Sequence, residues 1–257
     1  MSETAAASRG ELMVAQAARE IRDGETVFVG MRLPLIAFVV AKRTHAPNAI
    51  GIFELGVMRD APSPALLYTM GDPPNISGAS WCTRTVAVMG LLQRGEVHAG
   101  FIGGAEVDRF GNLNTSYIGD PSHPTVKLPG SGGGADIACL AQRLIVIMTH
   151  EKKRLRDRVD YVTSPGYGDG GDWRSRVGLP RGGTSVVITT LGVLRFDPTT
   201  REAYLASYHR GSSVDDCVRE TGWPLRVAPD VRETVAPTDA ELVAIRDYDP
   251  TGFWTGE

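Results

Sequence analysis

Glu54 is the residue whose place in the sequence points most directly to chemistry. It closes an apolar run, residues 49–53, and is followed by a leucine and a glycine. In an open parallel sheet, ligands bind beyond the carboxyl ends of the strands. A carboxylate at that place, partly withdrawn from water, is suited to act as a nucleophile or a base. The alternative interpretation is a loop carboxylate that accepts hydrogen bonds from backbone N–H groups.

A second candidate is the glycine-rich loop at residues 130–134, which precedes a segment expected to be helical. Consecutive glycines before a helix expose backbone N–H groups, which suits a phosphate or a developing oxyanion. The loop also matches the pattern G-x-G-x-x-A. However, residues 121–129 contain three prolines instead of the strand that a dinucleotide-binding fingerprint requires. A plain flexible turn is the alternative interpretation.

The remaining polar motifs are less specific. His150 opens a charged run, residues 150–154, for which we expect the solvated start of a helix, with a phosphate contact as the alternative. The glycine-rich stretch at residues 164–171 either lines a cleft or forms a surface loop. No G-x-S-x-G elbow and no P-loop occur, and the three cysteines match no zinc spacing. We therefore expect no metal site.

The order of the expected elements predicts the fold class. A helix begins at a capping box formed by Ser8 and Glu11 and ends at Gly24, and later helices begin at Ser213 and Thr238. Other helices are expected at residues 35–44 and 135–142, and strands at residues 26–29, 49–53, 99–102, 113–118, 144–148, 186–189, 193–196 and 203–208. This alternation predicts an α/β fold with an open, mostly parallel sheet and helices on both faces. The last two strands form a C-terminal antiparallel hairpin.

Composition excludes several classes of protein. The chain has 257 residues, and we predict a single domain over residues 1–257. The net charge of -3 and the absence of a helix-turn-helix pattern argue against nucleic-acid binding. No apolar run reaches the ~18 residues of a membrane span, and the first residues do not read as a signal peptide. We therefore expect a cytoplasmic protein that is not bound to a membrane.

Several stretches in a fixed order resemble the β subunit of class I CoA-transferases, and in particular that of the glutaconate CoA-transferases. The resemblance runs from about residue 10 to residue 250, and it is carried by residues 33–36, 40–43, 53–56, 101–105, 111–114, 118–120, 130–138, 150–154, 160–166 and 178–180. The resemblance implies that a coenzyme A thioester is a substrate and that no cofactor is bound permanently.

The resemblance also implies roles for the two candidate sites. In this family a glutamate at the end of such a strand attacks the acyl-CoA thioester and then carries CoA as a glutamyl-CoA thioester, in a ping-pong cycle. Glu54 stands at the matching position. Gly132, Gly133 and Gly134 are similar to the family's glycine loop, which implies an oxyanion or CoA contact. Leu55 stands where the glutaconate enzymes have a serine, which implies a change in the acid accepted.

The family further implies a separate α subunit of the same fold, paired with this chain, and dicarboxylic acids as acceptors by analogy. Alternatives remain. Relatives of this fold act as CoA-thioester hydrolases, ring-opening enzymes that cleave C–C bonds, or decarboxylases, and the ring-opening and decarboxylating groups lack the glutamate. Retention of Glu54 favours transfer. A non-catalytic ligand-binding subunit is the alternative from another class, because a fold does not determine a function.

Overall fold

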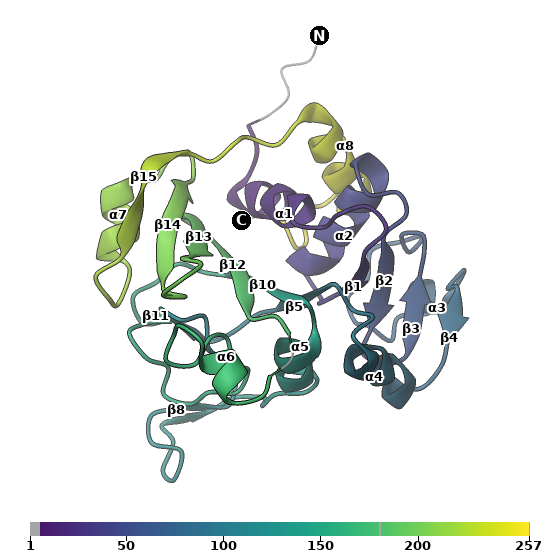
Figure 1. Cartoon of the computed structure of the whole chain (residues 1–257). Coiled ribbons are helices and arrows are strands. Elements are labelled where there is room, and N and C mark those ends of the chain that lie inside the picture. The colour runs from purple at the N-terminus through teal and green to yellow at the C-terminus, as the bar shows by residue number, and fades with distance from the viewer. Residues whose placement is uncertain (1–5, 180, 257) are drawn as a thin grey trace. The chain divides into compact units, whose positions relative to one another are not determined.

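The computed structural model describes residues 6–179 and 181–256. The chain divides into two compact units, Met1–Thr85 with Val235–Glu257 (unit 1) and Val86–Thr234 (unit 2). Figure 1 labels the elements of both units. The mixed α/β class is confirmed. The single domain over residues 1–257 stays a prediction.

Unit 1 is built on four strands. They are β1 (Thr26–Phe28), β2 (Ile50–Phe53), β3 (Val57–Arg59) and β4 (Trp81–Cys82), hydrogen-bonded in that order. β1 and β2 are parallel, whereas β3 pairs antiparallel with β2 on one side and with β4 on the other. The parallel pair was predicted from its apolar sequence. The antiparallel extension was not, because β3 and β4 are too short to show a pattern.

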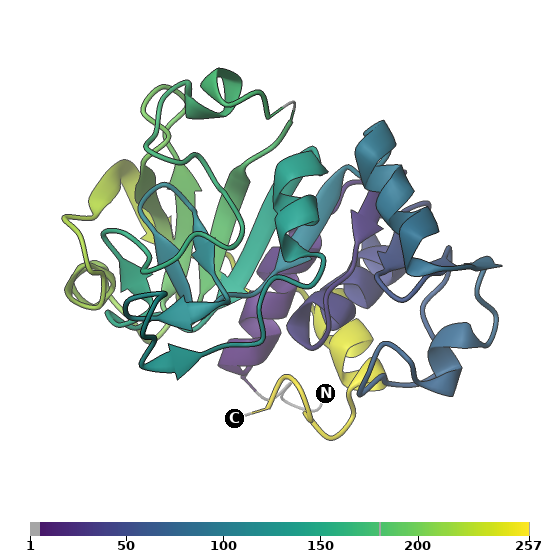
Figure 2. The same ribbon diagram turned by 90° about the horizontal axis from the view of Figure 1, so that it is seen from below.

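Helices cover the sheet of unit 1. α1 (Arg9–Arg19), α2 (Leu33–Thr44) and α8 (Asp239–Tyr248) pack against one another, as the two ribbon views show (Figures 1 and 2). A Cβ added at Gly51 would lie 2.7 Å from the ring of Phe38, so α2 lies directly on β2. The short α3 (Pro73–Ile76) follows β3. α1 ends at Arg19, earlier than the predicted end at Gly24.

Unit 2 contains the second group of strands. Six of them are hydrogen-bonded in the order β15 (Arg226–Glu233), β14 (Ala203–Tyr208), β13 (Gly192–Phe196), β12 (Thr184–Thr189), β10 (Arg143–Met148) and β5 (Ala99–Ile102). β5, β10 and β12 are parallel, and β13 and β14 form the predicted antiparallel hairpin. β15 pairs with β14 in parallel. The fully buried interior of β10 agrees with its apolar sequence.

The rest of unit 2 consists of short elements. α4 (Thr85–Arg94) begins at the boundary between the units, and α5 (Gly134–Leu140), α6 (Trp173–Arg176) and α7 (Val214–Arg219) follow. α5 packs on β5 and β10, and a Cβ at Gly100 would lie 2.2 Å from Ile137 of this helix. A small sheet joins β11 (Leu155–Arg156), β6 (Glu106–Asp108) and β7 (Leu113–Asn114), while β8 (Tyr117–Ile118) pairs with β9 (Val126–Lys127).

Two local predictions are wrong. The strand expected over residues 113–118 is divided into β7 and β8, which belong to different sheets. The side chain of Asn114 accepts hydrogen bonds from the N–H groups of Ser116 and Tyr117, at 2.9 and 3.2 Å, and this turn interrupts the strand. The helix expected to begin in residues 150–154 is a turn that leads into β11.

Candidate active site

Glu54 lies directly beyond the carboxyl end of β2. It is the first residue of a three-residue turn that connects β2 to β3, and the N–H of Gly56 closes the turn on the carbonyl of Phe53 at 2.9 Å. Ile52 and Phe53 are buried, whereas Glu54 is half-buried. The predicted position at a strand end is therefore confirmed. The side chain leaves a rigid, buried strand and reaches partly exposed surroundings, which suits a carboxylate that must meet a substrate.

Gly56 fixes the course of this turn. Its φ is +109°, and a Cβ at this residue would lie 2.3 Å from the carbonyl oxygen of Thr83. The backbones of the two residues are joined, because the N–H of Thr83 donates to the carbonyl of Gly56 at 2.8 Å. Only glycine satisfies both the positive φ and the close approach. The glycine two residues after Glu54 thus holds the carboxylate in place.

The loop after β1 brings a strained residue to the same edge of the sheet. The N–H of Val29 continues the pairing with β2 by donating to the carbonyl of Ile52 at 2.8 Å. Arg32 then precedes α2 with φ 68° and ψ -126°, a conformation that normally belongs to glycine. Its guanidinium lies over the ring of Trp254, 5.2 Å from the centroid. Strain of this kind is concentrated at functional sites. Arg32 was not predicted as a site residue, because only the tertiary structure imposes a positive φ on an arginine.

The glycine-rich loop belongs to unit 2, at the start of α5. Gly132 has φ 48° and is exposed, and Gly133 lies next to the first residue of the helix. The N–H of Gly134 donates to the carbonyl of Ser131 at 2.7 Å, which closes a tight turn. Within the described residues the N–H of Gly132 has no hydrogen-bond partner. An exposed amide of this kind can donate to an anion.

The two less specific motifs are each anchored by buried residues, while Lys152, Lys153 and Asp169 within them are exposed. His150 is buried, and its ring lies within hydrogen-bond distance of the hydroxyls of Thr189 and Thr221, at 2.8 and 3.0 Å. Burial lowers its pKa to about 4, so the ring is neutral at physiological pH. In the stretch 164–171, the N–H groups of Gly166 and Gly168 both donate to the Asn112 side chain at 3.0 Å. The same stretch also contributes Tyr167 and Gly171 to the lining of a cavity, as the interpretation of a cleft-lining loop predicts.

Neither a membrane span nor a metal cluster is found in the residues described. Over residues 6–179 and 181–256, none of the helices combines the length and the apolar character needed to cross a bilayer. In the same ranges no three histidine, cysteine, aspartate or glutamate side chains come together as ligands for a metal ion.

Comparisons with known proteins find a matching family model and similar chains. A family model described as "Coenzyme A transferase" matches residues 11–220. The chain is 37% identical to the B (β) subunit of the 3-oxoadipate CoA-transferase of Pseudomonas knackmussii, over 93% of this chain and 92% of that relative. It is 38% identical to the B (β) subunit of the glutaconate CoA-transferase of Acidaminococcus fermentans, over 92% of this chain and 90% of that relative.

Solved structures show the same likeness. The crystal structure of glutaconate coenzyme A-transferase from Acidaminococcus fermentans superposes with a TM-score of 0.90 at 35% identity, covering 97% of this chain and 98% of that chain. A structure of the decarboxylase AibA/AibB superposes with a TM-score of 0.83 at 26% identity, covering 96% of each chain. One fold therefore carries enzymes with different activities.

Proposed function

The chain belongs to the coenzyme A transferase family, and we propose that it is the B (β) subunit of a heteromeric CoA-transferase. In this proposal the enzyme moves CoA between an acyl-CoA and a carboxylic acid, with dicarboxylic acids as the expected substrates. The names of two similar proteins support this class of reaction, since both are B (β) subunits of CoA-transferases that act on dicarboxylate skeletons. The observation that carries the proposal is the position of Glu54.

Glu54 is proposed as the nucleophile. One carboxylate oxygen of Glu54 attacks the thioester carbonyl and forms a C–O bond. The C–S bond breaks, CoA departs as its thiolate, and a mixed anhydride of Glu54 and the acyl group remains. The thiolate then attacks the carbonyl carbon of Glu54 and releases the first carboxylic acid as its anion. The acceptor carboxylate attacks the resulting glutamyl-CoA thioester, and the two steps run in reverse. This division of one exchange into several acyl transfers is covalent catalysis.

Each transfer builds a tetrahedral oxyanion, which needs fixed hydrogen-bond donors. A single donor of this kind contributes about 3–4 kcal/mol to transition-state stabilisation. We propose the loop of Gly132, Gly133 and Gly134 as an oxyanion or CoA contact. The exposed N–H of Gly132 supports this role, while the N–H of Gly134 is engaged with Ser131.

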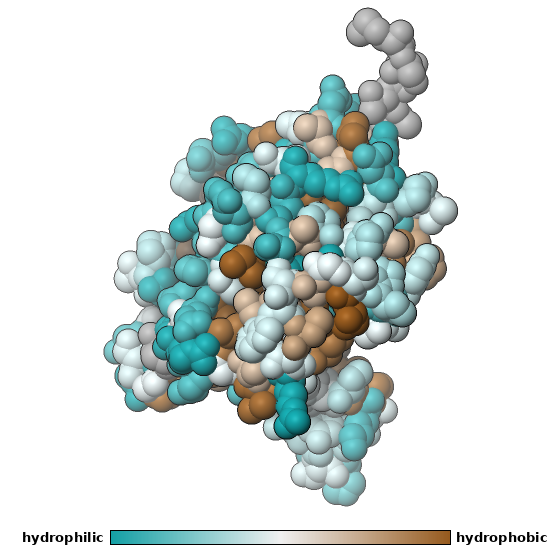
Figure 3. All heavy atoms as spheres, turned by 90° about the vertical axis from the view of Figure 1, so that its right-hand side faces the viewer, coloured by the Kyte–Doolittle hydropathy of each residue, from teal (hydrophilic) through white to brown (hydrophobic). Residues whose placement is uncertain are grey.

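A second chain of the same fold, the α subunit, is proposed as the partner. Large apolar side chains are exposed in unit 1, among them Tyr68, Trp81 and Phe253, with 55%, 44% and 55% of their surface accessible. The side of the molecule that carries α3 and β4 shows hydrophobic residues among hydrophilic ones (Figure 3). Exposed apolar surface of this kind is typical of protein–protein contacts. A cytoplasmic location stays a prediction.

The proposal is tested by trapping the covalent intermediate. The complex is isolated from its source cells through a tag on this chain, incubated with acyl-CoAs and reduced with sodium borohydride. Reduction of a glutamyl-CoA thioester to the alcohol lowers the mass of the residue by ~14 Da. We expect this loss at Glu54 in the wild type and none in Glu54→Gln. The exposed Glu96→Gln is the matched control and should leave the trapped fraction unchanged.

The principal alternative is a hydrolase, a C–C bond-cleaving enzyme or a decarboxylase of the same fold. The likeness to the decarboxylase AibA/AibB supports keeping this alternative. It predicts turnover of a CoA ester without an acceptor acid and without a mass change at Glu54. A non-catalytic ligand-binding subunit predicts neither turnover nor modification. If a complex that turns over acyl-CoA never shows the modified Glu54, the transferase mechanism is wrong.

A further inference from the structure

Unit 2 contains a cavity that none of the proposed steps uses. Its volume is about 470 Å³, and it opens to solvent. It lies between α6, the segment before β12 and the turn of the β13–β14 hairpin. Its polar lining includes Tyr167, Arg174, Ser175, Arg181, Thr199 and Arg201. Neither Glu54 nor the glycine-rich loop lines it. Cavities of a few hundred Å³ with converging polar groups are typical of small-molecule sites.

The lining carries an excess of positive charge. Among the residues described, Arg174, Arg181 and Arg201 form no ion pair with a carboxylate. Asp172, which also lines the cavity, is paired at 2.9 Å with Arg176, and this arginine does not line the cavity. Three arginines without acidic partners therefore line one cavity. Because surface arginines normally find carboxylates or remain in open solvent, this arrangement favours an anionic ligand.

The guanidinium groups are held in place before any ligand arrives. Arg174 is buried, and all five of its N–H groups donate to backbone carbonyls at 2.7–3.3 Å. The guanidinium of Arg181 donates to the carbonyls of Leu92, Gln93 and Leu140, which do not line the cavity. These two arginines therefore contribute positive charge, and Arg201 is the one whose guanidinium can meet a ligand. Arg201 has φ 61°, and its guanidinium lies over the buried ring of Tyr167 at 5.1 Å from the centroid. An arginine held with a positive φ against an aromatic ring gives up little further freedom when it binds.

We propose that this cavity binds a small molecule through its phosphate groups. The guanidinium fork of Arg201 matches the geometry of phosphate oxygens, Arg174 and Arg181 add positive charge, and the hydroxyls of Ser175 and Thr199 can add neutral donors. The cavity is large enough for a nucleotide-sized phosphate ester. Two sources share this chemistry, namely the phosphates of a CoA substrate and a separate phosphorylated metabolite. The proposal does not depend on Glu54 or on the transferase mechanism.

The test is calorimetric titration of the intact complex with inorganic pyrophosphate and with adenosine 3′,5′-bisphosphate, at low ionic strength because salt screens the interaction. Pantetheine, which carries no phosphate, is the ligand control and should not bind the cavity. We expect Arg201→Gln to weaken pyrophosphate binding by roughly tenfold, which corresponds to ~1.4 kcal/mol. Arg219→Gln, which removes an exposed charge on α7 whose carboxylate partners Asp216 and Glu220 do not line the cavity, should change the affinity by less than about twofold.

A second pair of variants keeps the proposal testable if an arginine variant fails to fold. Ser175 is exposed on α6, so Ser175→Asp adds a negative charge without disturbing the interior, and Ser175→Asn is its neutral match. Ser175→Asp should weaken pyrophosphate binding at least about fivefold relative to Ser175→Asn. Absence of saturable binding, or equal weakening by Arg219→Gln, would overturn the proposal, as would unchanged affinity in Ser175→Asp.

Competition between CoA and pyrophosphate shows which molecule supplies the phosphate groups. If CoA displaces pyrophosphate and the cavity variants raise the KM for CoA without lowering kcat, the phosphates belong to the substrate. If pyrophosphate binds without competing with CoA, the ligand is a separate metabolite. Both results support an anion site. Binding is measured without turnover, so failure of the borohydride experiment at Glu54 leaves this test unaffected.

Discussion

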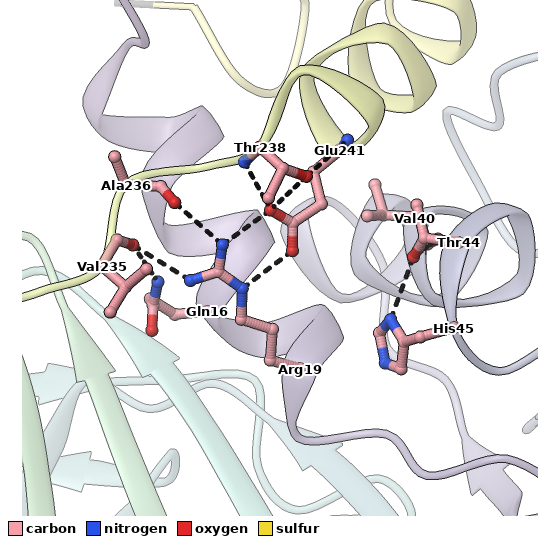
Figure 4. A network of polar contacts seen from close by, with 9 residues as sticks. All are labelled: Gln16, Arg19, Val40, Thr44, His45, Val235, Ala236, Thr238 and Glu241. Atoms are coloured by element: carbon pink, nitrogen blue, oxygen red, sulfur yellow. Dashed lines mark hydrogen bonds and ion pairs between the residues drawn. The ribbon is translucent and has the colours of Figure 1, made fainter.

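Glu241→Gln should destabilise the protein through a contact between the two ends of the chain. Glu241 is buried on α8, and its two carboxylate oxygens accept hydrogen bonds from Arg19 of α1 at 2.8 and 2.7 Å. The same carboxylate accepts from the N–H and hydroxyl of Thr238, which caps α8. Arg19 also donates to the carbonyls of Val235 and Ala236 (Figure 4). This network attaches the C-terminal segment of unit 1 to its first helix.

The size of the destabilisation in Glu241→Gln follows from the number of hydrogen bonds that no longer have a charged acceptor. Hydrogen bonds to a charged group contribute about 1.5–3 kcal/mol, and a helix cap contributes about 1 kcal/mol. Glutamine keeps the shape and one acceptor oxygen, so we expect a decrease of about 2–3 kcal/mol in the free energy of unfolding at pH 7. Arg94 and Glu96 form an ion pair of the same 2.7 Å length with both side chains more than half exposed. Glu96→Gln should therefore produce no measurable change.

The pH dependence of stability tests whether the charge of Glu241 is the cause. Burial pushes the pKa of Glu241 up, but hydrogen bonds from Arg19 and Thr238 outweigh it, and the pKa lies below its usual value. The stability that this carboxylate contributes is therefore complete above the pKa of an unfolded glutamate and is lost as the pH falls through the lower, folded-state pKa. Urea denaturation followed by far-UV circular dichroism at pH 7, 5 and 4, with hydrogen exchange of α8, measures this. Equal losses in Glu241→Gln and Glu96→Gln, or a deficit that grows as the pH falls, would refute the reasoning.

Three further predictions concern single residues. Gly56→Ala should lower the free energy of unfolding by at least about 2 kcal/mol in urea denaturation, because the new Cβ meets the Thr83 carbonyl at 2.3 Å and the residue keeps a positive φ. Arg32→Gly should raise the melting temperature or leave it unchanged, because relief of the strained φ of 68° stabilises the protein by about 1 kcal/mol. A clear fall in the melting temperature would show that the contact of the Arg32 guanidinium with Trp254 outweighs the strain. His150 should stay neutral in NMR titrations down to about pH 5, because burial lowers its pKa to about 4. The stability that the neutral ring contributes is complete above about pH 6.5 and is lost as the pH falls toward 4. Between pH 7 and pH 5 the free energy of unfolding should therefore fall less in His150→Gln than in the wild type, by about 1–2 kcal/mol.

Much of the framework is determined by local sequence. The apolar runs that became β1, β2, β5 and β10 are recognisable because buried parallel strands carry apolar residues on both faces. The capping box at Ser8 and the helix starts at Ser213 and Thr238 form as predicted, and the two later starts also have capping boxes, because each such box depends on two residues three positions apart. The hairpin of β13 and β14 forms for a similar reason, since its turn sequence lies between its own strands.

Short elements and segments with competing side-chain contacts could not be predicted. β3, β4 and β11 have two or three residues, too few for a periodic pattern, and they exist because neighbouring strands supply hydrogen bonds. Asn114 divides an apparently continuous strand through its own side chain. His150 looks like the start of a charged surface run but is buried among threonine hydroxyls of distant segments.

For the candidate site, the sequence by itself determined which residues are present and where the strand that carries Glu54 ends. Only the tertiary structure decided that Gly56 must approach Thr83, that Arg32 adopts a positive φ, and that Arg174, Arg181 and Arg201 surround one cavity. The physical reason is the range of the interactions. Hydrogen-bonded turns and apolar periodicity act over a few residues, whereas close backbone approach, strain and converging charge arise between segments that chain folding brings together.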